Sequence, residues 1–342
     1  MSKVQERIID SVPTEEQKDT SFFKSVKKVL GKFGTLIALL LLCLIFTITS
    51  EEFLTFDNFM NIARQVSINA LLALGMLLPI LTAGIDLSVG AVLAFSSMIM
   101  GIVTVSMGMN PVIGILAALA VGAGFGLLNG VLLTKFHLPH PFISTMGTQF
   151  IARGLALMVT AAAPIAGFPL LIQYMGNGFV ANIVPFSFVL VIVVYIIMHI
   201  FLTKTKTGRY IYAIGGNKEA ARLSGINVNR VLLIVYTISG LLAGLAGVIQ
   251  VGRVNAAFPT AGMMYETDAI AAVIIGGASF FGGVGTVVGT AIGAAIIAVL
   301  RNGLNLLNVS SDIQMAVIGA VIILAVYVDV LRLRKKRKAG SN

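Results

Sequence analysis

The stretch TKTKTGRYIYAIGGNKEAARLSGINVNR, from Thr203 to Arg230, is the one long hydrophilic interruption between strongly apolar blocks. It carries six basic residues and one acidic residue. A charged side chain in the middle of a bilayer costs about 3 kcal/mol, so we expect this segment to lie in water beside a membrane. Composition alone fits an ordinary basic loop equally well. The order of its residues is more informative.

That order predicts one short helix inside the stretch. Gly215 and Gly216 interrupt the chain, and Asn217 is a favoured N-cap residue. Residues 218–223 are good helix formers, and Gly225 can close the turn that follows them. We expect this helix to lie flat on the membrane surface.

Several motifs, including this one, resemble a known family. The segment EAARLSGI at 219–226 resembles the EAA-type cytoplasmic loop of ABC importer permeases. Four stretches are similar to the ribose-type monosaccharide permeases: GIDLSVGAVLA at 84–94, GRYIYAIGGNKEAARLSGINVNR at 208–230, YETDAIAAVIIGGASFFGGVGTVVGTAIGA at 265–294 and RNGLNLLNVSS at 301–311. The resemblance covers about residues 34–330 and implies import of a ribose-like pentose, a hexose or a related polyol.

The resemblance also implies partners. It implies a homodimeric channel in the inner membrane of a bacterium, served by an extracytoplasmic sugar-binding protein and by an ABC ATPase subunit that binds and hydrolyses ATP. This chain would then need no cofactor of its own. The short helix would dock into a groove on the ATPase, and the resemblance assigns this coupling role to Gly216, Asn217, Glu219, Ala220, Ala221, Arg222, Leu223, Ser224 and Gly225.

Composition also predicts a membrane protein, independently of the family resemblance. Of its 342 residues 57% are apolar and 11% are charged, and the mean hydropathy is +0.97. This leaves too little polar surface to cover a soluble globule of that length. The single cysteine, Cys43, lies within the first apolar run, which excludes a disulfide framework. We expect no cleaved signal, because about thirty mostly polar residues precede that run.

Hydropathy predicts an all-α polytopic protein with about ten transmembrane helices, some of them broken or re-entrant. A cytoplasmic tail, 1–33, precedes a transmembrane permease domain, 34–331, which contains the cytoplasmic loop 204–230; a basic tail, 332–342, follows it. The expected spans are 34–49, 66–82, 89–107, 111–134, 143–161, 184–203, 231–251, a short span from 268 with its return over 284–300, and 313–331.

The basic residues orient these spans. Of the 24 Lys and Arg residues, 20 fall in the two tails, the central loop and a short turn at Lys135. The positive-inside rule then predicts that both termini are cytoplasmic and that 164–182, which has no basic residue, is an extracytoplasmic loop. The net charge of +10 indicates contact with anionic lipids and not with nucleic acid, because the basic clusters lie beside the membrane.

Two acidic residues mark expected breaks in the helices. Asp86 follows Gly84 just before apolar periodicity resumes, and Asp268 precedes a second small, apolar stretch. Each can cap the start of a half-helix inside a protein-lined space. For Asp86 a structural cap and a cap that also lines the pathway both remain open. The two motifs also hint at an internal repeat.

A polar stripe marks the fifth expected span. Thr145, Thr148, Gln149 and Arg153 fall at helical spacing and should face protein or water, either as pathway lining or as interhelical hydrogen bonds. The glycines of 122–130 and 240–247 instead predict close helix packing. The candidate pathway residues are Asp86, Ser88, Thr145, Gln149, Arg153, Asp268 and Asn302.

Signatures of catalysis and metal binding are missing from the sequence. The Gly31-Lys32 pair lacks the spacing of a phosphate-binding loop, so we expect no ATPase activity and no catalytic residues. His137, His140 and His199 are scattered and predict no metal site. Two other classes stay open: a secondary transporter of a small neutral solute, for which the few ionisable residues of 62–203 are thin evidence, and a membrane scaffold.

Overall fold

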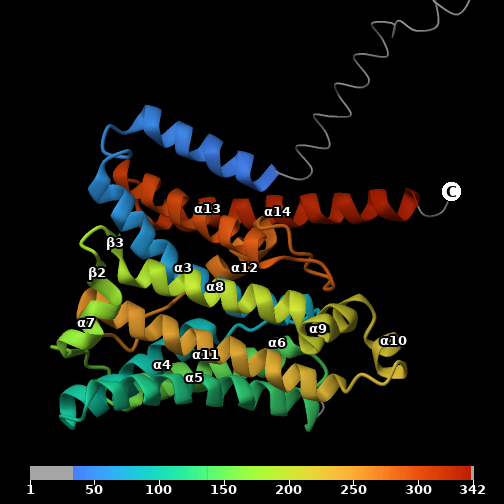
Figure 1. The fold of residues 1–342 in the computed structure, drawn as a ribbon, viewed down its shortest axis with the longest axis horizontal. Helices are drawn as coiled ribbons and strands as arrows, with labels where there is room; N and C mark the ends of the chain where they lie inside the picture. The colour runs from blue at the N-terminus through green and yellow to red at the C-terminus, as the bar shows by residue number, and fades with distance from the viewer. Residues whose placement is uncertain (1–33, 137, 340–342) are drawn as a thin grey trace, which may run out of the picture.

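The computed structural model describes residues 34–136 and 138–339. The described chain is mostly helical, with long helices running roughly alongside one another and short elements gathered at the two ends of the bundle (Figure 1). The predicted N-terminal tail, 1–33, and His137 lie outside the described residues. The predicted all-α class is confirmed.

The helices and strands have the following bounds. A first helix, Gly34–Thr49, precedes α3 (Phe56–Leu81), α4 (Val89–Gly101), the π-helix η1 (Ile102–Ser106), α5 (Pro111–Thr134), α6 (Pro141–Met158), α7 (Leu170–Asn177), α8 (Phe186–Lys204), α9 (Lys206–Gly216), α10 (Lys218–Leu223), α11 (Val228–Val254), α12 (Tyr265–Ile275), α13 (Val287–Leu306) and α14 (Ser311–Ala339). Two small antiparallel pairs join β1 (Ile165–Ala166) to β4 (Ala256–Ala257) and β2 (Phe179–Val180) to β3 (Val184–Pro185).

Seven of these helices are long and apolar enough to cross a membrane: α3, α4 with η1, α5, α8, α11, α13 and α14. The remaining three predicted spans are also helical, but Gly34–Thr49 and α12 are short, and α6 carries the polar stripe. The polytopic class is therefore confirmed, while the number of ten crossings stays a prediction. In α12 the chain forms only 11 helical residues, too few to span a bilayer alone.

The helix α3 forms the centre of the bundle. In its most apolar window 89% of the residues are buried, against 11% in α14, so α3 is enclosed by protein while α14 is outermost. Its neighbours are α11, α12 and α13, and side chains such as Leu74 and Leu77 are fully buried between them. An apolar helix surrounded by helices is a core helix as well as a span.

The close helix packing predicted for the glycines of 122–130 and 240–247 is confirmed, and the structure shows that the two stretches pack against each other. In α5, a Cβ on Gly122 would overlap the carbonyl oxygen of Gly240 in α11, and a Cβ on Gly126 would overlap that of Tyr236. The two backbones touch because the α5 glycines carry no Cβ to separate them, and at Gly122 the facing Gly240 carries none either. Gly124 takes no part, since nothing lies within 4 Å of the position its Cβ would occupy.

The break before α4 lies deep in the bundle. Asp86, three residues before Val89, contacts Ser239 in the middle of α11 and Asn129 inside α5. The first turn of α4 therefore begins inside the bundle, against the middle of α11 and the C-terminal part of α5. This supports the predicted broken helix, in which irregular backbone is enclosed by protein.

The segment 164–182, predicted as an extracytoplasmic loop, contains β1, α7 and β2. The helix α7 packs on α11 where Gly176 faces the backbone of Gly252 and Arg253. Asn255 ends α11 in a left-handed turn (φ 54°), and its side chain accepts a hydrogen bond from the backbone N–H of Phe168 at 2.9 Å. Hydropathy missed α7 because a helix of 8 residues has too few turns to show a period.

The positions of the two chain ends agree with the predicted topology. The first helix runs from the side of α10 toward the side of α7, and the end of α14 and the helix α10 lie toward one end of the bundle, opposite α7 and the β2–β3 pair (Figure 1). This arrangement is what two termini on the side of the basic loop require, and their cytoplasmic location stays a prediction. The basic tail predicted at 332–342 continues α14 as helix as far as Ala339.

Candidate functional site

The basic loop folds into two helices, not the single helix that the sequence predicted. The predicted one is α10: the side chain of Asn217 accepts a hydrogen bond from Ala220 N at 2.9 Å, and Gly225 adopts a left-handed turn with φ 82°. The predicted cap and the predicted turn are both confirmed. Gly216 is the last residue of α9, so it precedes the helix to which it was assigned.

One face of α10 is exposed, and the opposite face packs on the bundle. Ala221 is buried against the bundle. Leu223, in contrast, is 82% exposed, the highest value among the large apolar residues of the basic loop. Glu219 and Arg222 form an exposed ion pair at 3.0 Å one turn apart. Ser224 donates back to the carbonyl of Ala220 at 2.9 Å, which closes the helix. The result is a short, capped helix with a single projecting leucine.

The unpredicted helix α9 connects α10 to the bundle. The Thr205 side chain caps its start by accepting from Gly208 N at 3.0 Å, and Ile211 and Ile214 are buried. The hydroxyl of Tyr212 donates to the carbonyl of Gly285 at 2.9 Å. Burial raises the pKa of Tyr212, so this hydroxyl stays protonated and available as a donor.

A second group of polar residues, the Asp86 network, surrounds the start of α4. The Asp86 carboxylate accepts hydrogen bonds from Ser88 N (3.1 Å), Ser88 Oγ (2.6 Å) and Ser239 Oγ (2.8 Å). Asn129 donates to Ser88 Oγ at 3.0 Å and accepts from Thr148 Oγ1 at 2.6 Å. All five residues are almost fully buried. The network joins α4, α5, α6 and α11.

This geometry corrects the capping role predicted for Asp86. Its side chain reaches the amide of Ser88, which is the N-cap residue itself, and not the free amides of the first turn of α4. Thr145, another pathway candidate, is buried and donates to Pro141 O at 3.0 Å. In this conformation Asp86, Ser88 and Thr145 are interior groups with hydrogen-bond partners.

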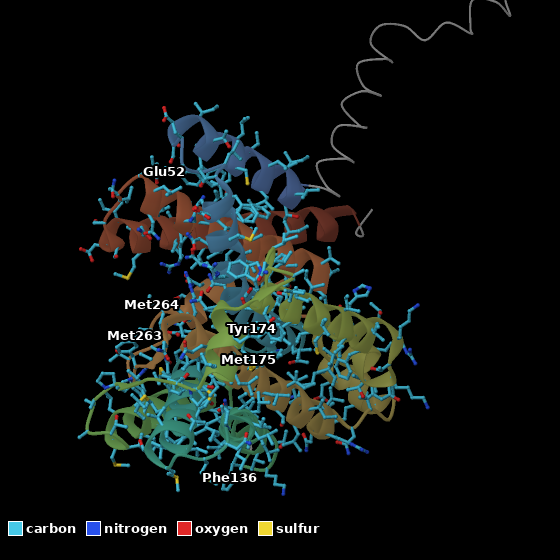
Figure 2. The ribbon with its side chains drawn as sticks, turned by 60° about the vertical axis from the view of Figure 1, so that its left-hand side comes forward. Glu52, Phe136, Tyr174, Met175, Met263 and Met264 are labelled. Carbon is cyan, nitrogen blue, oxygen red and sulfur yellow. The ribbon has the colours of Figure 1, made fainter. Side chains whose placement is uncertain are left out.

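The outer part of the polar stripe contacts the segment before α12. Arg153 donates to the carbonyls of Pro259 (2.6 Å) and Ala261 (2.7 Å), and Gln149 donates to Glu266 Oε1 at 3.3 Å. These three side chains are only partly buried. The same segment carries the exposed Met263 and Met264, which stand at the edge of the molecule in Figure 2.

Asp268 does not cap α12, so that prediction was wrong. The helix begins three residues earlier, and Asp268 is instead paired bidentately with Arg301 of α13 at 2.8 and 2.9 Å. Asn302, expected outside the membrane, is 8% exposed within α13 and exchanges hydrogen bonds with Asn58 of α3 at 2.7 and 3.1 Å. A one-dimensional pattern shows that a helix starts nearby but not which group pairs with the carboxylate.

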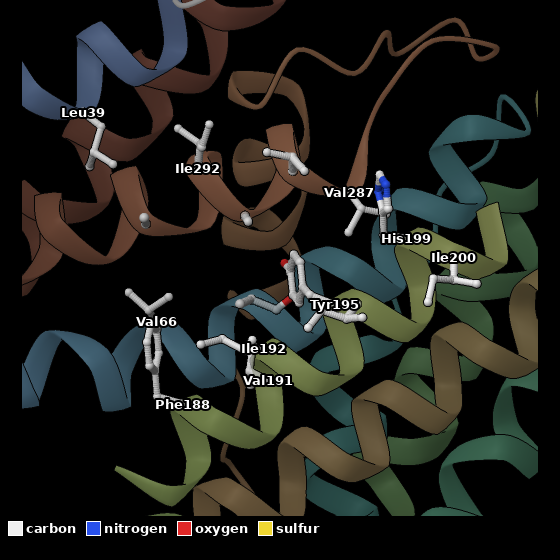
Figure 3. A pocket seen from close by; sticks show the side chains of 15 residues that line it. Leu39, Val66, Phe188, Val191, Ile192, Tyr195, His199, Ile200, Val287 and Ile292 are labelled. Atoms are coloured by element: carbon white, nitrogen blue, oxygen red, sulfur yellow. The ribbon is translucent and has the colours of Figure 1, made fainter. Parts of the chain in front are cut away.

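The cavity beside Tyr195 is unsuitable for a sugar. This groove of about 540 Å³ lies between α3, α8 and α13 and is lined almost entirely by aliphatic side chains such as Ile192 and Ile292 (Figure 3). The Tyr195 hydroxyl is already bonded to Ala70 O at 2.8 Å. A hydroxyl-rich ligand needs hydrogen-bonding groups that this surface does not offer.

The histidines within the described ranges have structural places. His140 caps α6 by accepting from Phe142 N at 3.1 Å, and His199 lies at one end of the apolar groove. Across residues 34–136 and 138–339 no group of three or more His, Cys, Asp or Glu side chains is placed to hold a metal ion.

Sequence reasoning missed four residues of these sites: Asn129, Ser239, Glu266 and Arg301. Asn129 carried a usable signal, because it is a strongly polar residue inside an otherwise apolar span, and Arg301 carried a weaker one as the charge that directly follows the span 284–300. Ser239 and Glu266 carried no such signal. A serine in a helix can donate its hydroxyl to the carbonyl four residues earlier, so its presence in a span is ordinary, and Glu266 lies next to a loop.

The chain is similar to known permeases over most of its length. The sequence pattern of the family described as "Branched-chain amino acid transport system / permease component" matches residues 58–326. The ribose import permease protein RbsC of Escherichia coli is 46% identical over 299 residues, 86% of this chain and 92% of that protein. RbsC of Bacillus subtilis is 46% identical over 303 residues, 88% and 93% of the two chains.

A relative named for another sugar is nearly as similar. The D-allose transport system permease protein AlsC of Escherichia coli is 42% identical over 302 residues, covering 87% of this chain and 91% of AlsC. No solved structure matches the chain.

Proposed function

The chain belongs to the family of branched-chain amino acid transport system permease components, and on this premise we propose that it imports a monosaccharide through a bacterial cytoplasmic membrane. It is the membrane-spanning permease subunit of an ABC importer, a transport subunit and not an enzyme. The family description names amino acids, but the relatives at 42 to 46% identity are named for ribose and allose. A ribose-like pentose or a hexose is therefore the proposed cargo.

The observation that carries the role is the exposed helix α10. An isolated capped helix with a leucine that is 82% exposed, in an otherwise hydrophilic loop, is suited to filling a groove on another protein. We assign that groove to the ATPase subunit. ATP would be bound and hydrolysed there, so that this chain needs no cofactor.

We expect Leu223→Asp to abolish copurification of the ATPase subunit and sugar uptake, because a carboxylate would have to be desolvated in the apolar groove. Leu170→Asp is the matched control for copurification: Leu170 is 81% exposed but lies on α7 at the opposite end of the bundle, so the ATPase should still copurify. Copurification from membranes and uptake of labelled ribose, allose and galactose are measured together. Unchanged copurification with Leu223→Asp would remove α10 from ATPase docking.

The proposed pathway passes the polar face of α6 and the start of α12. Gln149, Arg153 and Glu266 supply hydrogen-bond donors and acceptors, the groups that a sugar needs, and they are partly exposed. The buried candidates Asp86, Ser88, Thr145, Asp268 and Asn302 would act behind this surface by holding the helices that form it. Because the surface lies at the edge of one chain, we propose that a second copy completes the channel.

Cysteine labelling tests this pathway. In a Cys43→Ser background, Gln149→Cys should react with a water-soluble thiol reagent, and the sugar should slow the reaction. Thr148→Cys is the control on the same helix, because Thr148 is 1% exposed and should stay unreactive. Protection of Gln149→Cys throughout the ATP cycle would show that α6 contacts only protein there.

The remaining partners follow from this proposal. An extracytoplasmic binding protein would deliver the sugar to the end of the bundle that carries α7, opposite α10. Lipids would cover the exposed apolar faces of α5, α8 and α14, whose most apolar windows are 22%, 28% and 11% buried.

A further inference from the structure

Three segments far apart in the sequence meet at the end of α9 without intervening side chains. A Cβ on Gly215 would overlap Leu81 O at the end of α3 and Gly283 N in the loop between α12 and α13. Gly283 N donates to Leu81 O at 3.0 Å. A Cβ on Gly282 would lie 2.9 Å from both Gly215 O and Ala83 N. We call Gly215 and the segments 81–83 and 282–283 the glycine joint.

The helix α9 is held at its other end in the same way. A Cβ on Gly208 would overlap the carbonyls of Phe201 and Leu202 in the last turn of α8. Between the two glycines, the hydrogen bond from Tyr212 to Gly285 fixes the middle of the helix to the loop after α12. A helix in contact at both ends and in the middle should move as a rigid unit together with the end of α3 and the loop between α12 and α13.

The glycine joint is connected along the chain to the two short helices α4 and α12. Residue 83 is followed within three residues by Asp86, whose network positions the start of α4. The 276–286 loop connects α12 to α13, and its Ser279 donates to Asp329 of α14 at 3.1 Å. Movement of α9 would therefore reach α3 and the 276–286 loop through backbone contacts, and α4 and α14 through the side-chain hydrogen bonds of Asp86 and Ser279.

We propose that the Gly215 end of α9, packed on Leu81 and Gly283, is the joint that transmits movement of the ATPase-docked α10 to α3 and to the loop between α12 and α13. This inference rests on the proposed function. It separates two tasks: α10 binds the ATPase, and α9 carries the displacement. Backbone packed on backbone has no side-chain rotamers to absorb a small shift, so displacement is passed on instead of being lost.

Neighbouring glycines allow a matched test in the complete transporter. Gly215→Ala should push α9 away from Leu81, whereas Gly216→Ala meets nothing within 4 Å and adopts the same helix. With Gly215→Ala we expect normal ATPase copurification and continued ATP hydrolysis, but a loss of sugar uptake of about tenfold, within the usual range of coupling between allosteric sites. Gly216→Ala should match the wild type in all three measurements.

The outcomes separate this inference from the proposed function. If the wild-type chain copurifies no ATPase, the proposed function fails. If it does, and Gly215→Ala takes up sugar as well as Gly216→Ala, the joint transmits nothing. Should Gly215→Ala fail to accumulate in the membrane, Tyr212→Phe decides, because it removes one hydroxyl and no packing. Uptake per ATP hydrolysed should fall several-fold with Tyr212→Phe, and an unchanged ratio overturns the inference.

Discussion

Replacing Asp268 by Leu is expected to deplete the protein from the membrane, because it leaves the guanidinium of Arg301 unpaired inside the bundle. The Asp268 side chain is 3% exposed and that of Arg301 22%, and two hydrogen bonds join them. Removing one partner of a buried ion pair typically costs about 3–5 kcal/mol, which is comparable with the whole stability of many domains. Membrane abundance and the midpoint of thermal unfolding in detergent measure the loss.

A double variant and a surface pair supply the controls. Asp268→Asn with Arg301→Gln replaces both charges by neutral hydrogen-bonding groups and should recover much of the abundance lost with Asp268→Leu. Glu219→Leu breaks the ion pair with Arg222, whose side chains are 67% and 69% exposed, and should change abundance little, since such pairs contribute about 0–1 kcal/mol. Equal losses from Asp268→Leu and Glu219→Leu would mean that Arg301 finds water or another partner.

The second large effect is expected at Asp86. Asp86→Leu leaves the hydroxyls of Ser88 and Ser239 and the amide of Ser88 without their acceptor, each at a cost of about 1–3 kcal/mol in a buried site. Asp86→Asn keeps one acceptor oxygen, and the Ser239 hydroxyl can rotate to accept from the new amide. We therefore expect Asn to preserve folding and most of the uptake, and Leu to abolish both.

Asp57 is the matched control for Asp86. It lies in the first turn of α3 and is exposed, so Asp57→Leu should leave abundance close to that of the wild type. Abundance and sugar uptake are compared for the Asn and Leu variants at both positions. If Leu and Asn behave alike at residue 86, the Asp86 network does not hold the start of α4, and the broken helix is stabilised by packing alone.

The basic loop, 204–230, illustrates how much local sequence can predict. Asn217 and Gly225 predicted the start and end of α10 correctly, because capping and left-handed turns depend on a few adjacent residues. The same reasoning read Gly215 and Gly216 as a break, whereas α9 runs through both. Glycine is permissive in isolation, and here its function is to let Leu81 approach, a contact across 134 positions that no local rule contains.

Sequence alone determined the membrane class, most helix positions and the close packing at the glycines of α5 and α11, because hydropathy and small-residue spacing are read along one chain. Tertiary structure decided the partners of the buried polar groups. Asp86 could have capped α4 and Asp268 could have capped α12; Ser239 beside one and Arg301 beside the other come from remote helices. A buried carboxylate must find hydrogen bonds somewhere, so the sequence shows the need, and only the folded bundle shows which groups meet it.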